Sequence, residues 1–574
     1  MNIKNLTIRN IKSFGEEVNV DFQDNLNIFI GPNAGGKSNL MDILNIVFLY
    51  FFVYPWRIFS EVDSETGYIT RQYFQNRRDQ IFNPINRFLD KHNKRLNEDQ
   101  EIKIVFKPEF EDIKNIETLL ENSEELTVFE GRNYTSSHVK TFIDSLKDFD
   151  IKELKDKTLE YVIRNYALDP KNIGQKIFLG YLNGFDLYSL LISEYNNTVG
   201  DGEKIEQLFP PIIYFSPYRI PSTRNLIINI SGTNYFDLIE KYKKSDSKNV
   251  SSTFEVATYY FASKFLYAKD DDGIFEQDEE VKFVKEYLKK LGYRNFTFRL
   301  ANQPQSREKN IYEAILTKEN GERIEILKAS SGEKEIFNLL LGIFAFNIKN
   351  GVIIIDEPDL HLHPKWQHLL LELFFDLSIK RGIQFFLVTH SPHFITEKSI
   401  KTVLRVYARD GESKVISLPT LEESEKDLFQ IVNVFNNTKI FFADKVILVE
   451  GDIDLIIYDS ILRKLQAEKH DTQVIETLDV MGSGNFSKFK KFLDAWLIAS
   501  YRIADGGYQS ENGQNLFVLS GSDIGDYFQN IIKKQKYEIE DAIQIARKID
   551  SGEVGIPDEL LKIFNKIIEM KKYA

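Results

Sequence analysis

The stretch that decides the fold is Leu26-Asn-Ile-Phe-Ile30-Gly31-Pro-Asn-Ala-Gly-Gly36-Lys37-Ser38. A short apolar run followed by G-x-x-x-x-G-K-S/T predicts a strand, a phosphate-binding loop and the start of a helix. Glycines let backbone N–H groups turn toward phosphate oxygens, and the helix start adds partial positive charge. In this geometry the lysine reaches the β- and γ-phosphates and the Ser hydroxyl binds Mg²⁺. The expected nucleotide contacts are Gly31, Asn33, Gly36, Lys37, Ser38 and Asn39.

Two acidic residues follow a second apolar run, Val352-Ile-Ile-Ile-Asp356-Glu357. A short, continuously apolar run bounded by turn residues is typical of a buried parallel strand. At the end of such a strand, Asp356 is placed to hold the metal ion of a bound nucleotide and Glu357 to polarise an attacking water. A capping pair at a strand end is the structural alternative for these acids.

Two further segments fit a nucleotide site. Ser330-Ser331-Gly332-Glu333-Lys334 puts small residues at the start of a predicted helix, where anions bind. Val388-Thr-His390-Ser ends another strand with a histidine suited to contact a γ-phosphate. With the two stretches above, these segments resemble an ABC-type ATPase head. The resemblance implies that heads pair, so that Ser331 and Gly332 of one face the nucleotide of the other.

The long separation between Lys37 and Asp356 leaves room for a large insertion. We expect the N-terminal half of the head at 1–59 and its C-terminal half at 321–425. Between them, at 60–320, we expect a mostly helical insertion or dimerisation region, with ATPase strands returning near 210–220. A domain boundary is predicted near 425–440.

The remaining segment carries acidic residues at the ends of predicted strands. Val446-Ile-Leu-Val-Glu450-Gly-Asp-Ile-Asp454 reads as a strand, a turn and a helix, and Tyr501-Arg-Ile-Ala-Asp505 reads as another strand. The carboxyl ends of parallel strands meet at one edge of a sheet, so these acids should converge. Such a cluster favours a divalent cation with oxygen ligands, which could serve phosphodiester cleavage.

This segment, at 440–574, resembles a TOPRIM domain. An ABC-type ATPase followed by TOPRIM is the architecture of the OLD (overcoming lysogenization defect) nucleases, which the Gabija nuclease and retron-associated effectors share. The resemblance implies an α/β fold with a Rossmann-like C-terminal domain. It implies an ATP-regulated DNA endonuclease in bacterial anti-phage defence. Its expected catalytic residues are Glu357, His390, Glu450, Asp454, Asp505 and Asp526, and its expected metal ligands are Ser38, Asp356, Glu450, Asp454 and Asp505.

Two positions depart from the TOPRIM pattern. Gly507 stands where the second acid of Asp-x-Asp is usual, and Gly525 stands where a Glu is common, with Asp523 and Asp526 nearby. The alternative hypothesis is therefore an ATPase sensor whose degenerate TOPRIM domain binds nucleic acid or a partner without cleaving. The family also uses a C-terminal lysine, for which Lys562 and Lys566 are candidates.

Composition sets the remaining limits. The chain has 574 residues, a formal charge of −13 and no cysteine, which excludes disulfides, thiolate metal sites and cysteine nucleophiles. It fits a cytoplasmic protein, and the longest apolar run, 43–56, is too short for a bilayer. The basic, aromatic stretch 71–95 is a candidate DNA contact, with a solvated helical face as the equal alternative.

The expected cofactors and partners also follow from the resemblance. The cofactors are ATP and Mg²⁺, with Mn²⁺ or Ca²⁺ as alternatives at the TOPRIM site. The expected partners are DNA, a second copy or a higher homo-oligomer, and a defence-system protein or ribonucleoprotein. No membrane partner is expected.

Overall fold

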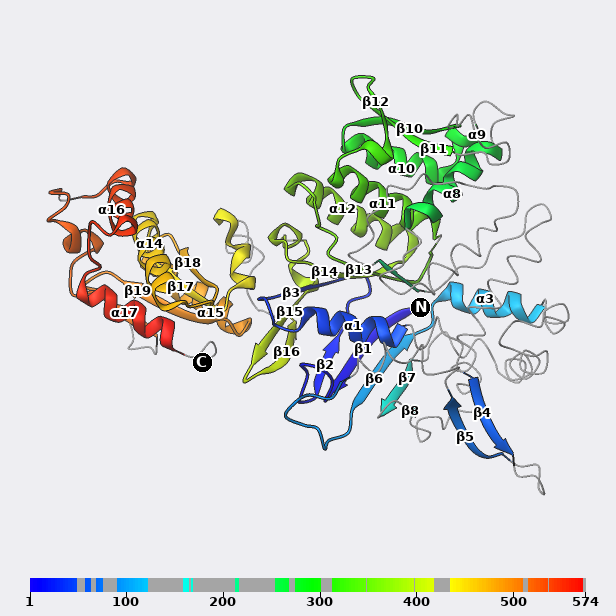
Figure 1. Cartoon of the computed structure of the whole chain (residues 1–574), viewed down its shortest axis with the longest axis horizontal. Coiled ribbons are helices and arrows are strands. Elements are labelled where there is room, and N and C mark those ends of the chain that lie inside the picture. The colour runs from blue at the N-terminus through cyan, green and yellow to red at the C-terminus, as the bar shows by residue number, and fades with distance from the viewer. Residues whose placement is uncertain are drawn as a thin grey trace. The chain divides into compact units, whose positions relative to one another are not determined.

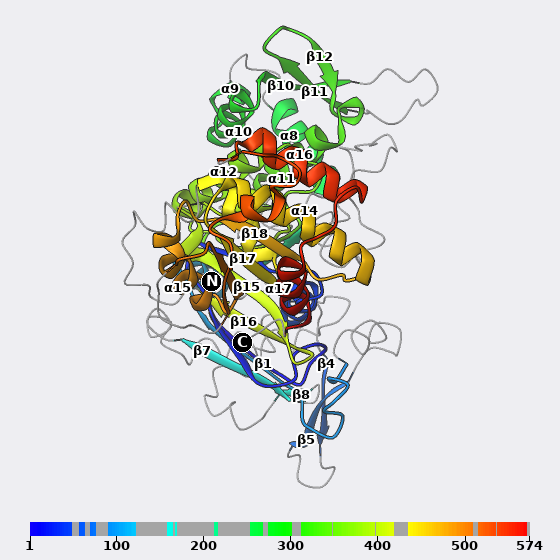
Figure 2. The same cartoon turned by 90° about the vertical axis from the view of Figure 1, so that its left-hand side faces the viewer.

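The structure is a computed structural model of the chain and forms two compact units. The first unit contains Met1–Phe29 and Ser38–Phe394, and the second contains Ile30–Lys37 and Ile395–Ala574. Each unit is described by itself, with the element labels of Figure 1; Figure 2 gives a second view. The structure describes residues 1–48, 57–62, 69–75, 90–121, 158–164, 167–168, 212–215, 253–267, 274–300, 312–346, 348–396, 398–417, 434–508, 515–534 and 536–570.

Four parallel strands of a six-stranded sheet form the centre of the first unit. They lie in the order β3-β14-β13-β9, and β3 and β14 are buried along their whole length. Val388 pairs with Asp356 on one side and with Phe29 on the other. The strand before the glycine-rich loop therefore ends level with the strand that carries Asp356. The strands are β3 (Leu26–Ile30), β9 (Ile212–Phe215), β13 (Val352–Asp356) and β14 (Gln384–Val388).

The helices that follow these strands begin and end at clear sequence signals. The helix after β13 has Pro364 in its first turn and Gly382, at φ +63°, as its C-cap. The helix before β13 is buried around most of its circumference, which suits a helix enclosed by other elements. These helices are α1 (Lys37–Phe48), α11 (Ser331–Ala345) and α12 (Pro364–Arg381).

A second, antiparallel sheet contains strands from the 60–320 stretch, where a mostly helical insertion stays a prediction. The order is β2-β1-β6-β7-β8, so strands from the insertion extend the N-terminal strands. Ile102, Ile104 and Phe106 are buried and alternate with less buried residues, a two-residue period that the charged composition obscured. The elements are β1 (Asn2–Arg9), β2 (Val18–Asp21), β6 (Glu101–Lys107), β7 (Leu159–Arg164) and β8 (Ala167–Leu168), with β4 (Arg57–Val62) pairing β5 (Ile69–Gln75) and α3 (Phe110–Glu121) following β6.

The end of the insertion combines helices with a three-stranded antiparallel sheet. The sheet order is β10-β11-β12, and α10 contacts both β10 and α11. This block therefore leads the chain directly into the helix that starts at Ser331. Its elements are α8 (Thr253–Tyr267), α9 (Ile274–Gln277), α10 (Glu279–Lys290), β10 (Tyr293–Leu300), β11 (Tyr312–Lys318) and β12 (Arg323–Glu325).

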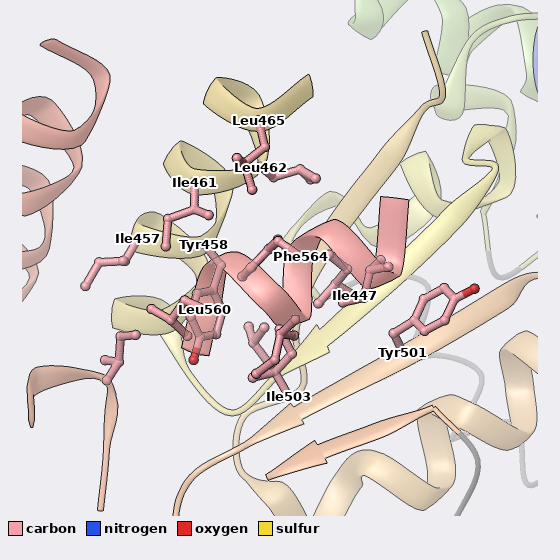
Figure 3. Packing of buried hydrophobic residues seen from close by; sticks show 14 of the residues in the cluster. Ile447, Ile457, Tyr458, Ile461, Leu462, Leu465, Tyr501, Ile503, Leu560 and Phe564 are labelled. Atoms are coloured by element: carbon pink, nitrogen blue, oxygen red, sulfur yellow. The ribbon is translucent and has the colours of Figure 1, made fainter. Parts of the chain in front are cut away.

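The second unit contains an antiparallel pair and a four-stranded parallel sheet. The pair is β15 (Val403–Arg409) with β16 (Glu412–Ser417), and the sheet order is β18-β17-β19-β20. In Figure 3, Tyr458 and Ile461 of one helix pack with Leu560 and Phe564 of another in the core of this sheet. The elements are β17 (Lys445–Val449), α14 (Asp452–Lys469), β18 (Ile475–Asp479), α15 (Phe486–Ala495), β19 (Ala499–Ala504), β20 (Leu516–Val518), α16 (Ile539–Ser551) and α17 (Asp558–Glu569).

A buried lysine, Lys445, connects the first strand and the last helix of this domain. Lys445, the first residue of β17, is fully buried, and its ammonium group donates to the carbonyl oxygens of Ile567, Ile568 and Met570 at 2.7, 2.9 and 2.6 Å. These carbonyls lie at the end of α17, where helix carbonyls lack partners within the helix. Lys445 thus joins α17 to the central strand β17 by hydrogen bonds.

Within the described residues, no helix is long and apolar enough to cross a membrane.

Candidate functional site

The glycine-rich loop is shaped by close backbone approaches. Gly31 and Gly36 have φ values of +141° and +110°, which favour glycine. A Cβ atom on Gly31 would overlap the carbonyl oxygen of Val406, and one on Gly35 would lie 2.6 Å from it. The loop therefore packs against β15 so tightly that a side chain at either position requires the backbone to shift.

Lys37 lies across this loop. Its side chain is 4% exposed, and its ammonium donates to the carbonyl oxygens of Gly31 at 2.8 Å and Pro32 at 3.0 Å. Ser38 and Asn33 are exposed, whereas the Asn39 amide donates to the Ser13 hydroxyl at 2.7 Å. The loop thus exposes the Ser38 hydroxyl, while the Lys37 ammonium is held by loop carbonyls and Asn39 makes a contact within the protein.

The acidic end of β13 is a strained turn. Glu357 has φ +51°, and its backbone N–H donates to the carbonyl of Val388 at 2.8 Å. Just beyond, the Thr389 hydroxyl donates to Asp359. Burial and the charge of Glu357 raise the pKa of Asp359. Motif spacing gave no signal for the Asp359–Thr389 bond, which ties the turn after β13 to the end of β14 beside His390.

The start of α11 is fixed by three contacts. Ser330 and Glu333 form a reciprocal capping box, in which the Glu333 carboxylate accepts from the Ser330 N–H at 2.7 Å. The hydroxyl of Tyr293, on β10, donates to Glu333, and these bonds lower the pKa of that carboxyl against its burial. A Cβ atom on Gly332 would lie 2.7 Å from the carbonyl oxygen of His361. Ser331 is left exposed on a rigid helix start.

Three acids, Glu450, Asp454 and Asp505, lie near one another at the carboxyl edge of the C-terminal sheet. Glu450 follows β17, and its Oε1 accepts from the backbone N–H of Asp505, which follows β19, at 2.9 Å. Asp454, in the first turn of α14, is 8% exposed. Burial, then the charges of Asp505 and Glu450, raise the pKa of Asp454 to about 7. Burial and Glu450 raise the pKa of Asp505 to about 6. A bound cation would relieve this mutual repulsion between partly buried carboxylates.

The loop after β20 contributes two more acids, Asp523 and Asp526, which differ in their contacts. The carboxylate of Asp526 accepts from the N–H and the hydroxyl of Ser522, both at 2.7 Å, and from Gln529 at 2.9 Å, so it is engaged within its own loop. Asp523 has a larger effect than Asp526 in raising the pKa of Asp505. A Cβ atom on Gly525 would lie 2.9 Å from the Asp523 carboxylate, which therefore occupies space beside the missing side chain.

Two observations bear on whether this acidic edge can bind a metal ion. Within the described residues, no three His, Asp or Glu side chains are gathered closely enough to hold a metal ion as they stand. Gly507 has φ +97°, so the position of the usual second acid has a backbone that disfavours any L side chain. The Gly506 N–H donates to the carbonyl of Gly521 at 3.0 Å, which joins the loops after β19 and β20.

The basic stretch 71–95 lies mostly outside the described residues, which omit 76–89 and the side chains of β5. Of its described cations, Lys91 donates to the carbonyl of Leu96 at 3.2 Å, and Arg95 pairs with Glu98 at 3.2 Å. These groups are engaged within the protein, and a DNA contact here stays a prediction. Of the candidate C-terminal lysines, Lys562 is exposed and Lys566 lies 5.4 Å from the ring centre of Phe517.

Comparison with known families decides the identity of the larger part. The AAA ATPase domain model matches residues 1–395, which is more than half of the chain. The chain belongs to this AAA ATPase family. A second model, the OLD-like (overcoming lysogenization defect protein-like) TOPRIM domain, matches residues 441–506. The AAA ATPase is therefore joined to an OLD-like TOPRIM domain, which confirms the expected α/β fold class and the resemblance.

Three curated relatives bear nuclease names. The Old nuclease of Escherichia phage P2 is 27% identical over 30% of this chain and 30% of its own, and the OLD nuclease of Thermus scotoductus is 28% identical over 25% and 29%. Endonuclease GajA of Bacillus cereus is 23% identical over 82% of this chain and 69% of its own. The match thus spans about a third of the first two relatives and over two thirds of the third.

Proposed function

We propose that this AAA ATPase with a TOPRIM domain is an ATP-regulated, divalent-metal-dependent DNA endonuclease of OLD type that acts in anti-phage defence. The observation that carries the proposal is the placement of Glu450, Asp454 and Asp505 near one another at one sheet edge, where the Glu450 carboxylate accepts from the Asp505 N–H and the pKa values of both Asp carboxyls are raised. The relatives named as nucleases support the reaction class.

The donor set fits a hard divalent cation, because carboxylate oxygens are the ligands that Mg²⁺ and Mn²⁺ take in proteins. Glu450, Asp454 and Asp505 would hold it after side-chain rotation, with Asp523 or Asp526 as an added acid. When bound, such a cation stabilises charge on the attacking and leaving oxygens of phosphodiester hydrolysis. Glu450 also fixes the Asp505 backbone through its hydrogen bond, so it orients the neighbouring acid.

In the ATPase half, we propose that Lys37 and Ser38 hold the phosphates of ATP and its Mg²⁺. Asp356 would assist with the metal, Glu357 would polarise the attacking water, and His390 would contact the γ-phosphate. The exposed Ser331 on its rigid helix start would face the nucleotide of a second copy. A homodimer is therefore part of the proposal, and a defence-system protein or ribonucleoprotein is the proposed further partner.

The test compares the purified full-length chain with Glu450→Gln and Asp505→Asn on supercoiled plasmid DNA, with Mg²⁺ or Mn²⁺ and with or without ATP. We expect nicking by the wild type and a loss of about 100-fold or more in each variant, as for groups that act as a unit. Glu468→Gln, an exposed acid on α14, is the matched control and should cleave normally. Full cleavage by both site variants would show that the assigned nuclease site is wrong.

The second candidate function is an ATPase sensor with a non-cleaving TOPRIM domain. The left-handed backbone at Gly507, in place of a second acid, favours it. This candidate predicts ATP hydrolysis and DNA binding with no cleavage of supercoiled, linear or single-stranded DNA under either metal. A plaque assay in cells would then still show protection that depends on Lys37 but not on Glu450.

A further inference from the structure

The antiparallel pair β15–β16 lies at residues 403–417, between the two matched family segments, 1–395 and 441–506. Neither match assigns it a role. Yet three consecutive residues of β15 face two different regions: Val406 and Tyr407 approach the glycine-rich loop, and Arg405 enters the TOPRIM domain. All of these contacts lie within the second compact unit.

On one side, the pair holds the glycine-rich loop. The Val406 carbonyl approaches Gly31 and Gly35 so closely that neither position has room for a Cβ atom. The hydroxyl of Ser413, on β16, donates to the carbonyl of Gly35 at 2.8 Å and is 1% exposed. Because these contacts are backbone packing and a buried hydrogen bond, a shift of the loop on binding phosphate must be transmitted to β15 and β16.

On the other side, Arg405 enters the TOPRIM domain. Its side chain is fully buried, and its guanidinium donates to four carbonyl oxygens: those of Phe441 at 3.3 Å, Ala443 at 3.1 Å, Trp496 at 3.2 Å and Leu497 at 3.4 Å. These carbonyls lie at the ends of the 3-10 helix Val434–Phe442 and of α15. Helix C-termini carry partial negative charge, so one guanidinium joins two helix ends.

The joined helix ends lead into the two strands that carry the acids. Ala443 is followed by β17, which ends just before Glu450, and Leu497 is followed by β19, which ends just before Asp505. The two strands are parallel neighbours, with Lys445 opposite Ala499. Arg405 therefore binds next to the starts of β17 and β19. The Glu450–Asp505 contact lies at the other ends of these strands, about 17 Å away at ~3.3 Å per residue.

We propose that Arg405 is a positioning residue that couples the glycine-rich loop to the acidic edge of the TOPRIM sheet. Nucleotide in the loop moves β15, and Arg405 passes that displacement to the starts of β17 and β19, which changes how Glu450 and Asp505 are placed. The inference rests on the proposed function, because it assigns the route by which ATP regulates the same nuclease site.

The test uses Arg405→Lys in the full chain, which keeps the charge but loses the planar fork that reaches several carbonyls. The first readout is the ratio of DNA nicking rates with and without saturating ATP. Allosteric coupling typically changes a binding affinity by about 5- to 150-fold, and the nicking-rate ratio reports the effect of ATP on the nuclease site. We expect the ratio to move toward 1 in Arg405→Lys, with ATP affinity unchanged. Arg409→Gln, an exposed arginine on the same strand, should keep the wild-type ratio.

The second readout needs no cleavage. Hydrogen–deuterium exchange of residues 441–450 and 496–505 is compared with and without ATP. We expect an ATP-dependent change in the wild type and in Arg409→Gln that is absent from Arg405→Lys and from Lys37→Ala. Should Arg405→Lys fail to fold, Ser413→Ala, which cuts the link at the loop side and leaves the Arg405 bonds intact, should weaken the same change.

The outcomes separate the two proposals. A wild type that never cuts DNA but shows the exchange response sinks the nuclease and keeps the coupling. A wild-type response in both Arg405→Lys and Ser413→Ala overturns the coupling and leaves the nuclease standing. An exchange response absent from the wild type also overturns the coupling.

Discussion

The glycine-rich loop and the acidic edge of the TOPRIM sheet both follow parallel strands, yet they are built differently. The loop is made of backbone: glycines allow turns and close approach to β15, and Lys37 is bound to the carbonyls of the loop itself. The acidic edge is made of side chains from separate strands, held in mutual repulsion. In the proposed function, ATP would enter a loop whose backbone is already shaped and would draw Lys37 from its carbonyls, whereas a cation at the acidic edge would relieve the repulsion.

In the glycine-rich loop, we expect the largest effect from the substitution Lys37→Ala. It should weaken ATP binding by about 30-fold or more, because truncating one partner of a buried charge pair costs ~2–5 kcal/mol and each ~1.4 kcal/mol is tenfold in affinity. Isothermal titration with a non-hydrolysable ATP analogue measures the effect, and Lys289→Ala, an exposed lysine of α10, is the control. Unchanged affinity in Lys37→Ala would contradict the assigned nucleotide site.

At the acidic edge, by contrast, the substitution Asp454→Asn should make the metal-free protein more stable. The folded-state pKa of Asp454 is raised to about 7, so the metal-free protein loses stability as pH rises from the unfolded-state value near 3.8 toward 7. Removing the charge should stabilise the metal-free protein at pH 8 by up to about 3–4 kcal/mol and change little near pH 4. Urea unfolding in a chelator measures it. Asp459→Asn on the same helix is the control, and a destabilised Asp454→Asn at pH 8 would disprove the repulsion.

A smaller effect is expected from Gly35→Ala, which tests the backbone character of the loop. The new Cβ atom would lie 2.6 Å from the Val406 carbonyl oxygen, so the loop or β15 must shift. Overpacking of this kind costs ~1–3 kcal/mol, and ATP affinity should fall with thermal stability. Gly484→Ala has open space around its Cβ position and should be neutral to both measurements. An equally neutral Gly35→Ala would show that the contact is not tight.

The smallest effect concerns Tyr293→Phe, which removes one hydrogen bond to Glu333 at the start of α11. The loss should be about 1 kcal/mol of stability, as for a typical buried hydrogen bond. If Ser331 acts from this helix start, the ATP hydrolysis rate should fall several-fold with ATP affinity unchanged. A cycle with Glu333→Gln checks the pair: purely additive effects of the two changes would mean that the bond does not support the helix start.

The sequence predicts the glycine-rich loop better than the acidic edge, because the loop is local in the chain and the edge combines separate strands. The loop and the end of β13 could be placed from spacing alone, because strand, turn and helix are local in the chain. The contacts of Asp526 could not, because its hydrogen bond with the Ser522 N–H depends on how the loop after β20 folds. Strand β6 was missed because its alternation is masked by charged residues. Arg405 gave no signal, since its partners are backbone carbonyls 36 to 92 residues away.

The Lys445 contact sets the order in which the chain can mature during its synthesis. The ammonium group at the start of β17 finds its carbonyl partners 122 to 125 residues later, at the end of α17. At the ~5–20 residues per second of translation, that delay is roughly 6 to 24 s. Until those carbonyls are made, the ammonium group lacks the three oxygens that accept its hydrogen bonds in the folded chain, and burying it would cost free energy. The full burial of Lys445 therefore has to wait until α17 has been synthesised.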